Sequence, residues 1–318
     1  MNPEGGPASL TTPSPTDLTS LLDQACKHAG YRPGARLLRH FSNAVYLLDA
    51  APVVVRIGYG PQAVSTATVA LAVTRWLVKQ GFPAAASTEP PSGADQPLTV
   101  SWAGRDTAIT FWQYHPQGAV RTPPDSAALG QLAARLHRLP TPPISLPAYE
   151  PLQELHAVLS APGTASVLGG HRHSWLSRRV AELRRAFTDL KSCLGHGLIH
   201  ADMVTGNLLW NTDTRSDEHV LLCDWDCVSI GPREVDLVPI HHEPRFGAGS
   251  SVVDVFVGSY GYDLTQWRGY PVLLEIRELS TLTALIRLAP FNTTSAAELM
   301  HRIDCTTRGD RTAQWHAQ

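Results

Sequence analysis

Several hallmarks of secreted, membrane and nucleic-acid-binding proteins are missing from this 318-residue sequence. It has five cysteines, an odd number without CxxC spacing, and its start shows neither a basic nor an apolar segment, so we expect a reduced, cytoplasmic protein. No apolar run reaches the length of a membrane span. No run of five like charges occurs and the formal net charge is -2, so neither nucleic acid nor a membrane is an expected partner.

Three catalytic signatures are absent as well. There is no GxxxxGK[ST] phosphate loop and no GxSxG nucleophile elbow. His196 and His200 are four residues apart, but Gly195 and Gly197 interrupt a helix there and no Glu follows His196, so a zinc-binding HExxH helix is not predicted. These absences argue against a P-loop NTPase, against a serine hydrolase with a GxSxG nucleophile elbow and against a zinc protease with an HExxH helix.

The hydrophobic pattern predicts a small α+β lobe followed by a mostly helical one. A flexible tail over 1–15 precedes an amphipathic helix that Thr16 or Asp17 caps and Gly30 ends. Strand patterns follow at LLRHFSNAVYLL, PVVVRIG, LTVSW and AITFWQYH, with a helix over 62–80 between the second and third. We expect an N-lobe over 16–114 and a C-lobe over 115–318, with Asp125 capping the first C-lobe helix and further helices near 151–160, 174–193, 272–289 and 295–303.

The polar residues with the clearest chemical pattern lie in GLIHADMVTGNLLW and VLLCDWD. Asn207 precedes a short apolar strand, a polar turn follows, and 220–223 return as a second strand that ends at Asp224. This hairpin brings Asn207 and Asp224 to the same end, while Asp202 lies in a loop five residues before Asn207. Carboxylate and amide oxygens of this kind suit Mg²⁺.

His200-x-Asp202-x-x-x-x-Asn207 resembles the catalytic loop of protein kinases and, more closely, of the aminoglycoside phosphotransferase family. By chance this pattern is expected roughly 0.01 times in such a sequence. The resemblance implies a two-lobed protein-kinase-like fold in which Asp202 accepts or orients the proton of the acceptor hydroxyl, and Asn207 and Asp224 hold Mg²⁺ on ATP or GTP. It also implies that His200 and Asp236 brace the loop.

The resemblance continues in the predicted N-lobe. Ser42 and Asn43 lie where the family covers the nucleotide, and Arg56 stands where kinases carry a phosphate-pairing Lys. Gln113 and His115 lie where the interlobe segment of the family faces the purine, so the resemblance implies that they flank the nucleotide. The usual helix Glu is missing, since no Asp or Glu occurs between Asp49 and Glu89, so Arg56 must be oriented by phosphate or by another region.

The expected acceptor is a small molecule with a hydroxyl group, foremost an aminoglycoside or another antibiotic. Residues 141–318 hold 15 Lys/Arg against 20 Asp/Glu, which suits a cationic acceptor but is also ordinary for a soluble surface. The carboxylates proposed to bind it are Asp226, Glu243, Asp254, Asp263 and Glu275. A metabolic kinase of choline, homoserine or sugar and a nucleotide-binding pseudokinase remain as alternatives, and the protein is expected to be a monomer or homodimer.

Overall fold

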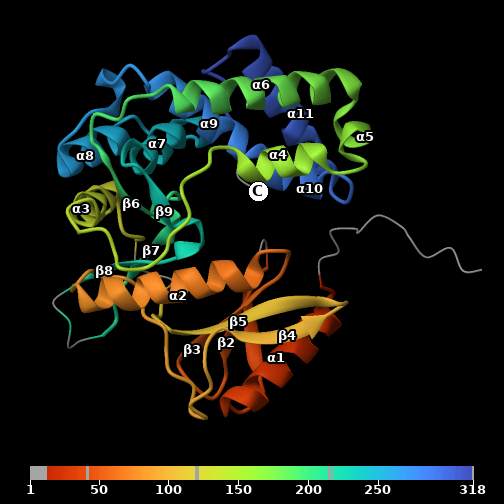
Figure 1. Cartoon of the computed structure of the whole chain (residues 1–318), viewed down its shortest axis with the longest axis vertical. Helices are drawn as coiled ribbons and strands as arrows, with labels where there is room; N and C mark the ends of the chain where they lie inside the picture. Colours follow the sequence, from red (N-terminus) through yellow and green to blue (C-terminus); the bar gives the residue numbers. More distant parts are fainter. Residues whose placement is uncertain (1–12, 41–42, 119–121, 214–215, 217, 317–318) are drawn as a thin grey trace, which may run out of the picture. The chain divides into compact units, whose positions relative to one another are not determined.

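The computed structural model describes residues 13–316 except 41–42, 119–121, 214–215 and 217 (Figure 1). The chain divides into two compact units, neither of which is one continuous stretch. The first unit contains Met1–Pro124, Thr141–Leu146 and Thr205–Val228; the second contains Asp125–Pro140, Pro147–Val204 and Ser229–Gln318. The first unit therefore has residues on both sides of the lobe boundary expected after Tyr114.

An antiparallel five-stranded sheet forms the centre of the first unit, with strand order β1-β2-β3-β5-β4. Its strands are β1 (Ala35–His40), β2 (Asn43–Leu48), β3 (Val53–Gly58), β4 (Leu98–Trp102) and β5 (Arg105–Gln113). The prediction of one strand over LLRHFSNAVYLL was wrong, because the chain reverses within it and pairs His40 with Ala44. The expected reversal between Leu48 and Val53 is present.

Helix α1 (Pro15–Ala29) packs its apolar face into the core of the first unit. Its N-cap is Ser14, and Asp17 completes a capping box by accepting from the Ser14 backbone, so the expected cap at Thr16 or Asp17 was wrong. The expected tail over 1–15 overlaps the helix, which begins at Pro15. Residues 1–12 lie outside the described part of the chain. Helix α2 (Ala63–Lys79) agrees with the predicted helix over 62–80.

The predicted hairpin belongs to the first unit. Strand β7 (Leu208–Trp210) pairs antiparallel with β8 (Val220–Leu222), between two short 3₁₀ turns, η1 (Thr205–Asn207) and η2 (Trp225–Cys227). Leu222 joins the hairpin to the segment after α2, since its N–H donates to Pro83 O at 2.9 Å and its carbonyl accepts from Ala85 N at 3.0 Å. Backbone bonds therefore hold the hairpin to the N-terminal part of the chain.

The second unit is mostly helical, as predicted, apart from the two-stranded pair of β6 (His196–Ile199) and β9 (Ser229–Pro232). Helices α3, α4, α6 and α11 correspond to predicted ones, the predicted helix near 272–289 is two helices, and α5, α7 and α8 were missed. The helices are α3 (Ser126–Leu136), α4 (Gln153–Ser160), α5 (Thr164–Leu168), α6 (Gly170–Thr188), α7 (Glu234–His242), α8 (Ser251–Tyr260), α9 (Tyr270–Ser280), α10 (Leu282–Leu288) and α11 (Thr293–Arg308), with 3₁₀ turns η3 (Glu243–Phe246) and η4 (Leu264–Gln266). Together the two units confirm the α+β class.

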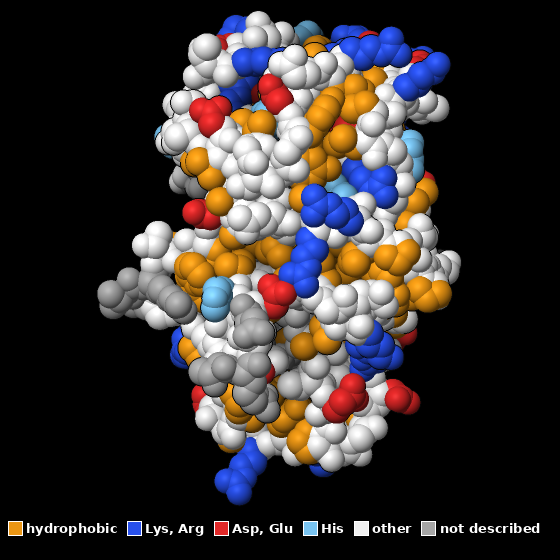
Figure 2. All heavy atoms as spheres, turned by 90° about the vertical axis from the view of Figure 1, so that its left-hand side faces the viewer, with side chains coloured by type: hydrophobic (Ala, Val, Ile, Leu, Met, Phe, Trp, Pro, Cys, Tyr) orange, Lys and Arg blue, Asp and Glu red, His pale blue; other side chains and the backbone are white. Residues whose placement is uncertain are grey.

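The molecular surface mixes side chains of all types. Figure 2 shows hydrophobic groups scattered among charged and polar ones, which is the ordinary condition of a folded chain. Within the residues that the structure describes, no helix combines the length and the apolar character needed to cross a lipid bilayer.

Gly130 of α3 lies at a close contact with α8 in the second unit. A Cβ there would lie 2.7 Å from the carbonyl oxygen of Phe256 and 2.9 Å from Cβ of Ser259, both in α8. We expect Gly130→Ala to lower the free energy of unfolding by about 1–3 kcal/mol through overpacking, measured by urea unfolding. Gly258→Ala is the matched control, because nothing lies within 4 Å of its Cβ position and it should be neutral or stabilising. Equal destabilisation by both changes would contradict this assignment.

Candidate active site

Arg56 of β3 binds two carboxylates from the segment after the β7–β8 hairpin. Its Nη1 donates to Oδ1 of Asp226 at 2.5 Å and its Nη2 to Oδ2 of the same carboxylate, while Nη2 lies 3.2 Å from Oδ1 of Asp224. Burial alone would lower the pKa of Arg56, but the charges of Asp226 and Asp224 raise it above its ordinary value. The guanidinium is thus a fixed positive charge in a bidentate ion pair.

This contact shows how Arg56 is oriented without a helix glutamate. Helix α2 has no acidic residue, and the acid that holds Arg56 is instead Asp226, two residues after Asp224. Asp226 was expected in the acceptor site. The structure places it in the first unit beside Arg56, and its partner lies 170 positions away in the sequence.

Asn207 and Asp224 lie at the same end of the hairpin, as the sequence pattern predicts. The N–H of Cys223 donates to Asn207 O at 2.9 Å, and Leu208 pairs with Leu222. Asp224 has a φ of 63°, in the left-handed region that non-glycine residues seldom adopt. Its carboxylate, one-quarter exposed, also lies 3.5 Å from Arg39 Nη2. The donors are hard oxygens, which fit a divalent metal such as Mg²⁺.

The other residues expected at the nucleotide make fewer or longer polar contacts than Arg56. Ser42 lies outside the described residues. Asn43 begins β2, and its Nδ2 is 3.5 Å from Oδ2 of Asp226. Gln113 is the last residue of β5, and its backbone N–H donates a hydrogen bond to Ala86 O. His115 is buried, which lowers its pKa, and its Nδ1 lies 3.4 Å from the Thr212 backbone N and hydroxyl.

The loop that carries Asp202 is held by hydrogen bonds to Asp236, a completely buried residue of α7. The Asp236 carboxylate accepts the N–H of His200 at 2.9 Å and the N–H of Ala201 at 2.7 Å, and it contacts Nε2 of His137 at 3.1 Å. Ala201 has a φ of 63°, so the backbone is strained next to Asp202. Charge-assisted bonds to two successive N–H groups hold that strained conformation.

Asp202 itself is more exposed than its support. Its side chain is 38% exposed, its N–H donates to Nδ1 of the buried His200 at 3.3 Å, and its Oδ1 accepts from Nη1 of Arg277 at 3.0 Å. Sequence reasoning missed Arg277, a residue of α9, because nothing in its helical context separates it from the other 25 Lys and Arg residues. All of these contacts lie within the second unit.

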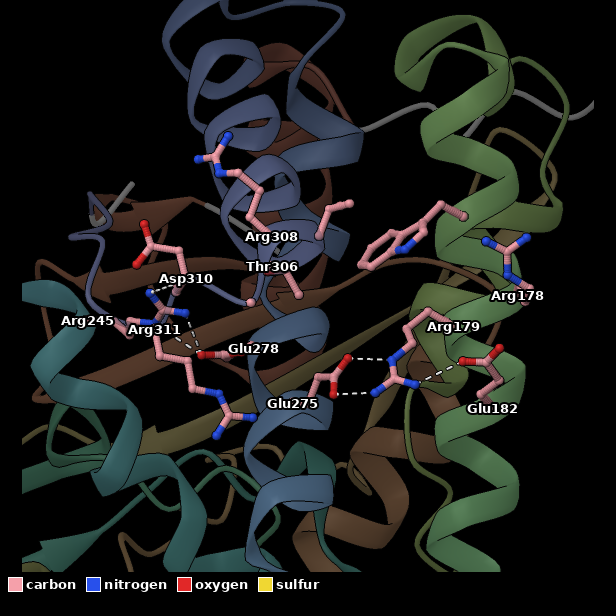
Figure 3. A pocket seen from close by; sticks show the side chains of 13 residues that line it. Arg178, Arg179, Glu182, Arg245, Glu275, Glu278, Thr306, Arg308, Asp310 and Arg311 are labelled. Carbon is pink, nitrogen blue, oxygen red and sulfur yellow. Dashed lines mark hydrogen bonds and ion pairs between the residues drawn. The ribbon is translucent and has the colours of Figure 1, made fainter.

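The other expected acceptor carboxylates differ in their surroundings. Asp254 is exposed on α8 and Asp263 caps η4, while Glu243 is half-buried at the start of η3, where burial raises its pKa. Glu275 lies in a pocket between α6, α9 and α11, where Nε and Nη2 of Arg179 each bind one of its oxygens at 2.6 Å (Figure 3). Glu275 and Asp226 are therefore both paired with arginine.

The pocket of Figure 3 is rich in arginine. Arg179 is bound by Glu275 and Glu182, and Arg245 by Glu278. Arg178, Arg308 and Arg311 point in different directions in Figure 3. Ion pairs therefore hold two of the arginines that line this pocket.

Comparison with known proteins identifies the class. The model of the phosphotransferase enzyme family, APH, matches residues 34–271, so the chain belongs to this family and is a small-molecule phosphotransferase. No curated protein matches the chain in sequence. The resemblance drawn from the catalytic loop is confirmed.

Solved structures support the same fold. A microcompartment-associated aminopropanol kinase has a TM-score of 0.66 and 18% identity, over 92% of this chain and 98% of its own. The amicoumacin kinase hAmiN, in complex with AMP-PNP, Ca²⁺ and Ami, has a TM-score of 0.67 and 16% identity, over 94% and 96%. The aminoglycoside phosphotransferase APH(3'')-Id of Streptomyces rimosus has a TM-score of 0.56 and 17% identity, over 83% and 98%. These similarities confirm the expected kinase-like fold.

Proposed function

We propose that this protein transfers the γ-phosphoryl group of ATP, with Mg²⁺, to a hydroxyl group of a small molecule. The observation that carries the proposal is the bracing of the Asp202 loop by Asp236. A buried charge is costly unless it is fully hydrogen-bonded, and here it is used to fix the loop that presents Asp202. Such preorganisation is what positioning catalysis requires.

On the acceptor side, Asp202 receives or orients the proton of the attacking hydroxyl. A carboxylate suits this role because it accepts hydrogen bonds, and its partial exposure leaves it accessible to a substrate. His200, buried behind it, orients the loop through the Asp202 N–H. The group to be phosphorylated must therefore reach Asp202 in the second unit.

On the nucleotide side, Asn207 and Asp224 would hold the divalent ion, which when bound neutralises phosphate charge. Arg56 is poised to bind phosphate with a guanidinium that Asp226 holds in place. The guanidinium of Arg56 is therefore oriented even though α2 lacks the usual acid. The retention of Asp202, which nucleotide binding alone does not need, argues against a pseudokinase.

The first acceptor class to test is an aminoglycoside or another antibiotic, since relatives named above act on such compounds. The second class is small metabolites, in the manner of the aminopropanol kinase. A specific observation favours the second class: two of the carboxylates expected to bind a polycation, Asp226 and Glu275, are already paired with arginine.

The direct test is phosphoryl transfer with Mg-ATP and Mg-GTP against aminoglycosides, nucleoside antibiotics, amino alcohols, hydroxy acids and sugars, read by mass spectrometry. We expect one class to gain a phosphate, with ADP formed in equal amount. Tight Mg-nucleotide binding without any product would favour the pseudokinase. Failure to bind either nucleotide would refute the proposal.

A further inference from the structure

Arg277 gives the Asp202 side of the site an unexpected positive charge. Its Nη1 lies 3.0 Å from Oδ1 of Asp202, and its side chain is 23% exposed against 38% for Asp202. An acceptor hydroxyl hydrogen-bonded to Oδ1 of Asp202 would lie within about 6 Å of this guanidinium nitrogen, allowing about 2.7 Å for the new bond. Substituents a few bonds from the hydroxyl are therefore in reach of Arg277.

The hydrogen-bonding capacity of Arg277 is largely unused. A guanidinium has five N–H donors, and Asp202 receives one of them. Within the residues that the structure describes, the buried Nε of Arg277 has no hydrogen-bond partner. By contrast, every guanidinium nitrogen of the buried Arg245 and Arg302 in the same unit donates at least one hydrogen bond.

This arrangement disfavours a cation next to the reacting hydroxyl. An ammonium there would face the guanidinium across a part-buried site, whereas a carboxylate would match its planar pair of N–H groups. Burial raises the pKa of Glu243, and the positive charge of Arg277 acts against that rise. The donor geometry of the guanidinium therefore matches an anionic group.

Resting on the proposed function, we infer that the acceptor is a hydroxy acid whose carboxylate binds Arg277. The acceptor oxygen forms a bond to the γ-phosphorus as the bond from that phosphorus to the bridging oxygen breaks. The hydroxyl proton passes to Asp202, and the products are the phosphate ester and ADP. Arg277 positions the acceptor with guanidinium N–H groups other than the one that Asp202 accepts.

The test uses the full chain and matched acceptors. Hydroxy acids with one to three carbons between hydroxyl and carboxylate are each compared with their carboxamide and with the amino alcohol of equal length. We expect wild type to prefer the carboxylate by about 100-fold in kcat/KM, because a site built for a charged partner rejects analogues that lack it. Arg277→Gln should reduce this preference to within about 3-fold, mainly through KM, and Arg277→Lys should restore part of it.

Arg287→Gln is the control, since it removes the same charge from α10, where Arg287 forms an exposed pair with Glu154 of α4, and it should keep the wild-type preference. Melting curves establish that each variant is folded. Equal use of carboxamides or amino alcohols by wild type would overturn the inference while leaving the kinase intact. So would an equal fall in kcat for every acceptor in Arg277→Gln, which would assign Arg277 to the transferred phosphoryl group. Absence of Mg-ATP binding and of any product would remove the proposed function and the inference with it.

Discussion

Asp202→Asn is expected to lower kcat by about 10³-fold, equivalent to about 4 kcal/mol of transition-state stabilisation. The amide cannot take the hydroxyl proton, yet its carbonyl oxygen can still accept from Arg277, so the local structure should be kept. Steady-state turnover with the acceptor found by screening measures the loss. Mg-nucleotide affinity, measured by calorimetry, should change by less than about 3-fold, because Asp202 does not serve as a metal ligand in the proposed mechanism.

Asp189→Asn, an exposed carboxylate that follows α6, is the control for the change of charge and should turn over like wild type. Wild-type turnover in Asp202→Asn would remove Asp202 from the chemistry. A large loss of nucleotide affinity would instead place it at the metal.

Asp224→Ala is expected to weaken Mg-nucleotide binding by about 100-fold or more, because it removes a proposed metal ligand. It also removes one of the two carboxylates that bind Arg56, although Asp226 should still hold the guanidinium. Titration with and without Mg²⁺ separates these effects. Metal-free nucleotide should bind the variant no more weakly than it binds wild type, since a negative charge near the phosphates has been removed.

The matched control is Asp106→Ala, an exposed carboxylate on β5 of the same unit. Unchanged Mg-nucleotide affinity in Asp224→Ala would exclude Asp224 from the metal site. An equal loss with and without Mg²⁺ would point to a structural role of Asp224 through Arg56 instead.

Local pattern was sufficient to predict the elements with strong periodicity. Helix α2 and the β7–β8 hairpin were found because apolar spacing and flanking polar turns point to one structure. The Asp202 loop was found through a spacing rare enough to identify the family. Chemistry confined to a few adjacent residues is thus readable in this sequence, although the roles of the individual site residues stay predictions.

Elements without periodicity were missed. Helix α7 is buried on nearly every side and contains Pro239, so it shows no amphipathic pattern. Strand β9, SIGP, is four residues long and carries Gly and Pro. The reversal between β1 and β2 was missed because the apolar and β-branched residues on both sides of it were taken for one long strand.

The contacts of the site's arginines could not be predicted either. Arg56 meets Asp226 across 170 positions and Arg277 meets Asp202 across 75. No local rule connects such residues, because their proximity depends on packing of the whole unit. The missing helix acid could show that Arg56 needs a partner, but not which residue supplies it.

The discontinuous first unit has a consequence for the order in which the protein forms during synthesis. The five strands of its sheet have all been synthesised once Gln113 has left the ribosome. Leu222 exchanges two backbone hydrogen bonds with the segment after α2, but it is synthesised more than a hundred residues later. Most of the helical unit's first half is translated in that interval. Until residues 220–226 have been made, Pro83 O and Ala85 N lack their backbone partners and Arg56 lacks both of its carboxylates. The N-terminal part of the chain therefore cannot complete its own unit before most of the chain has been synthesised.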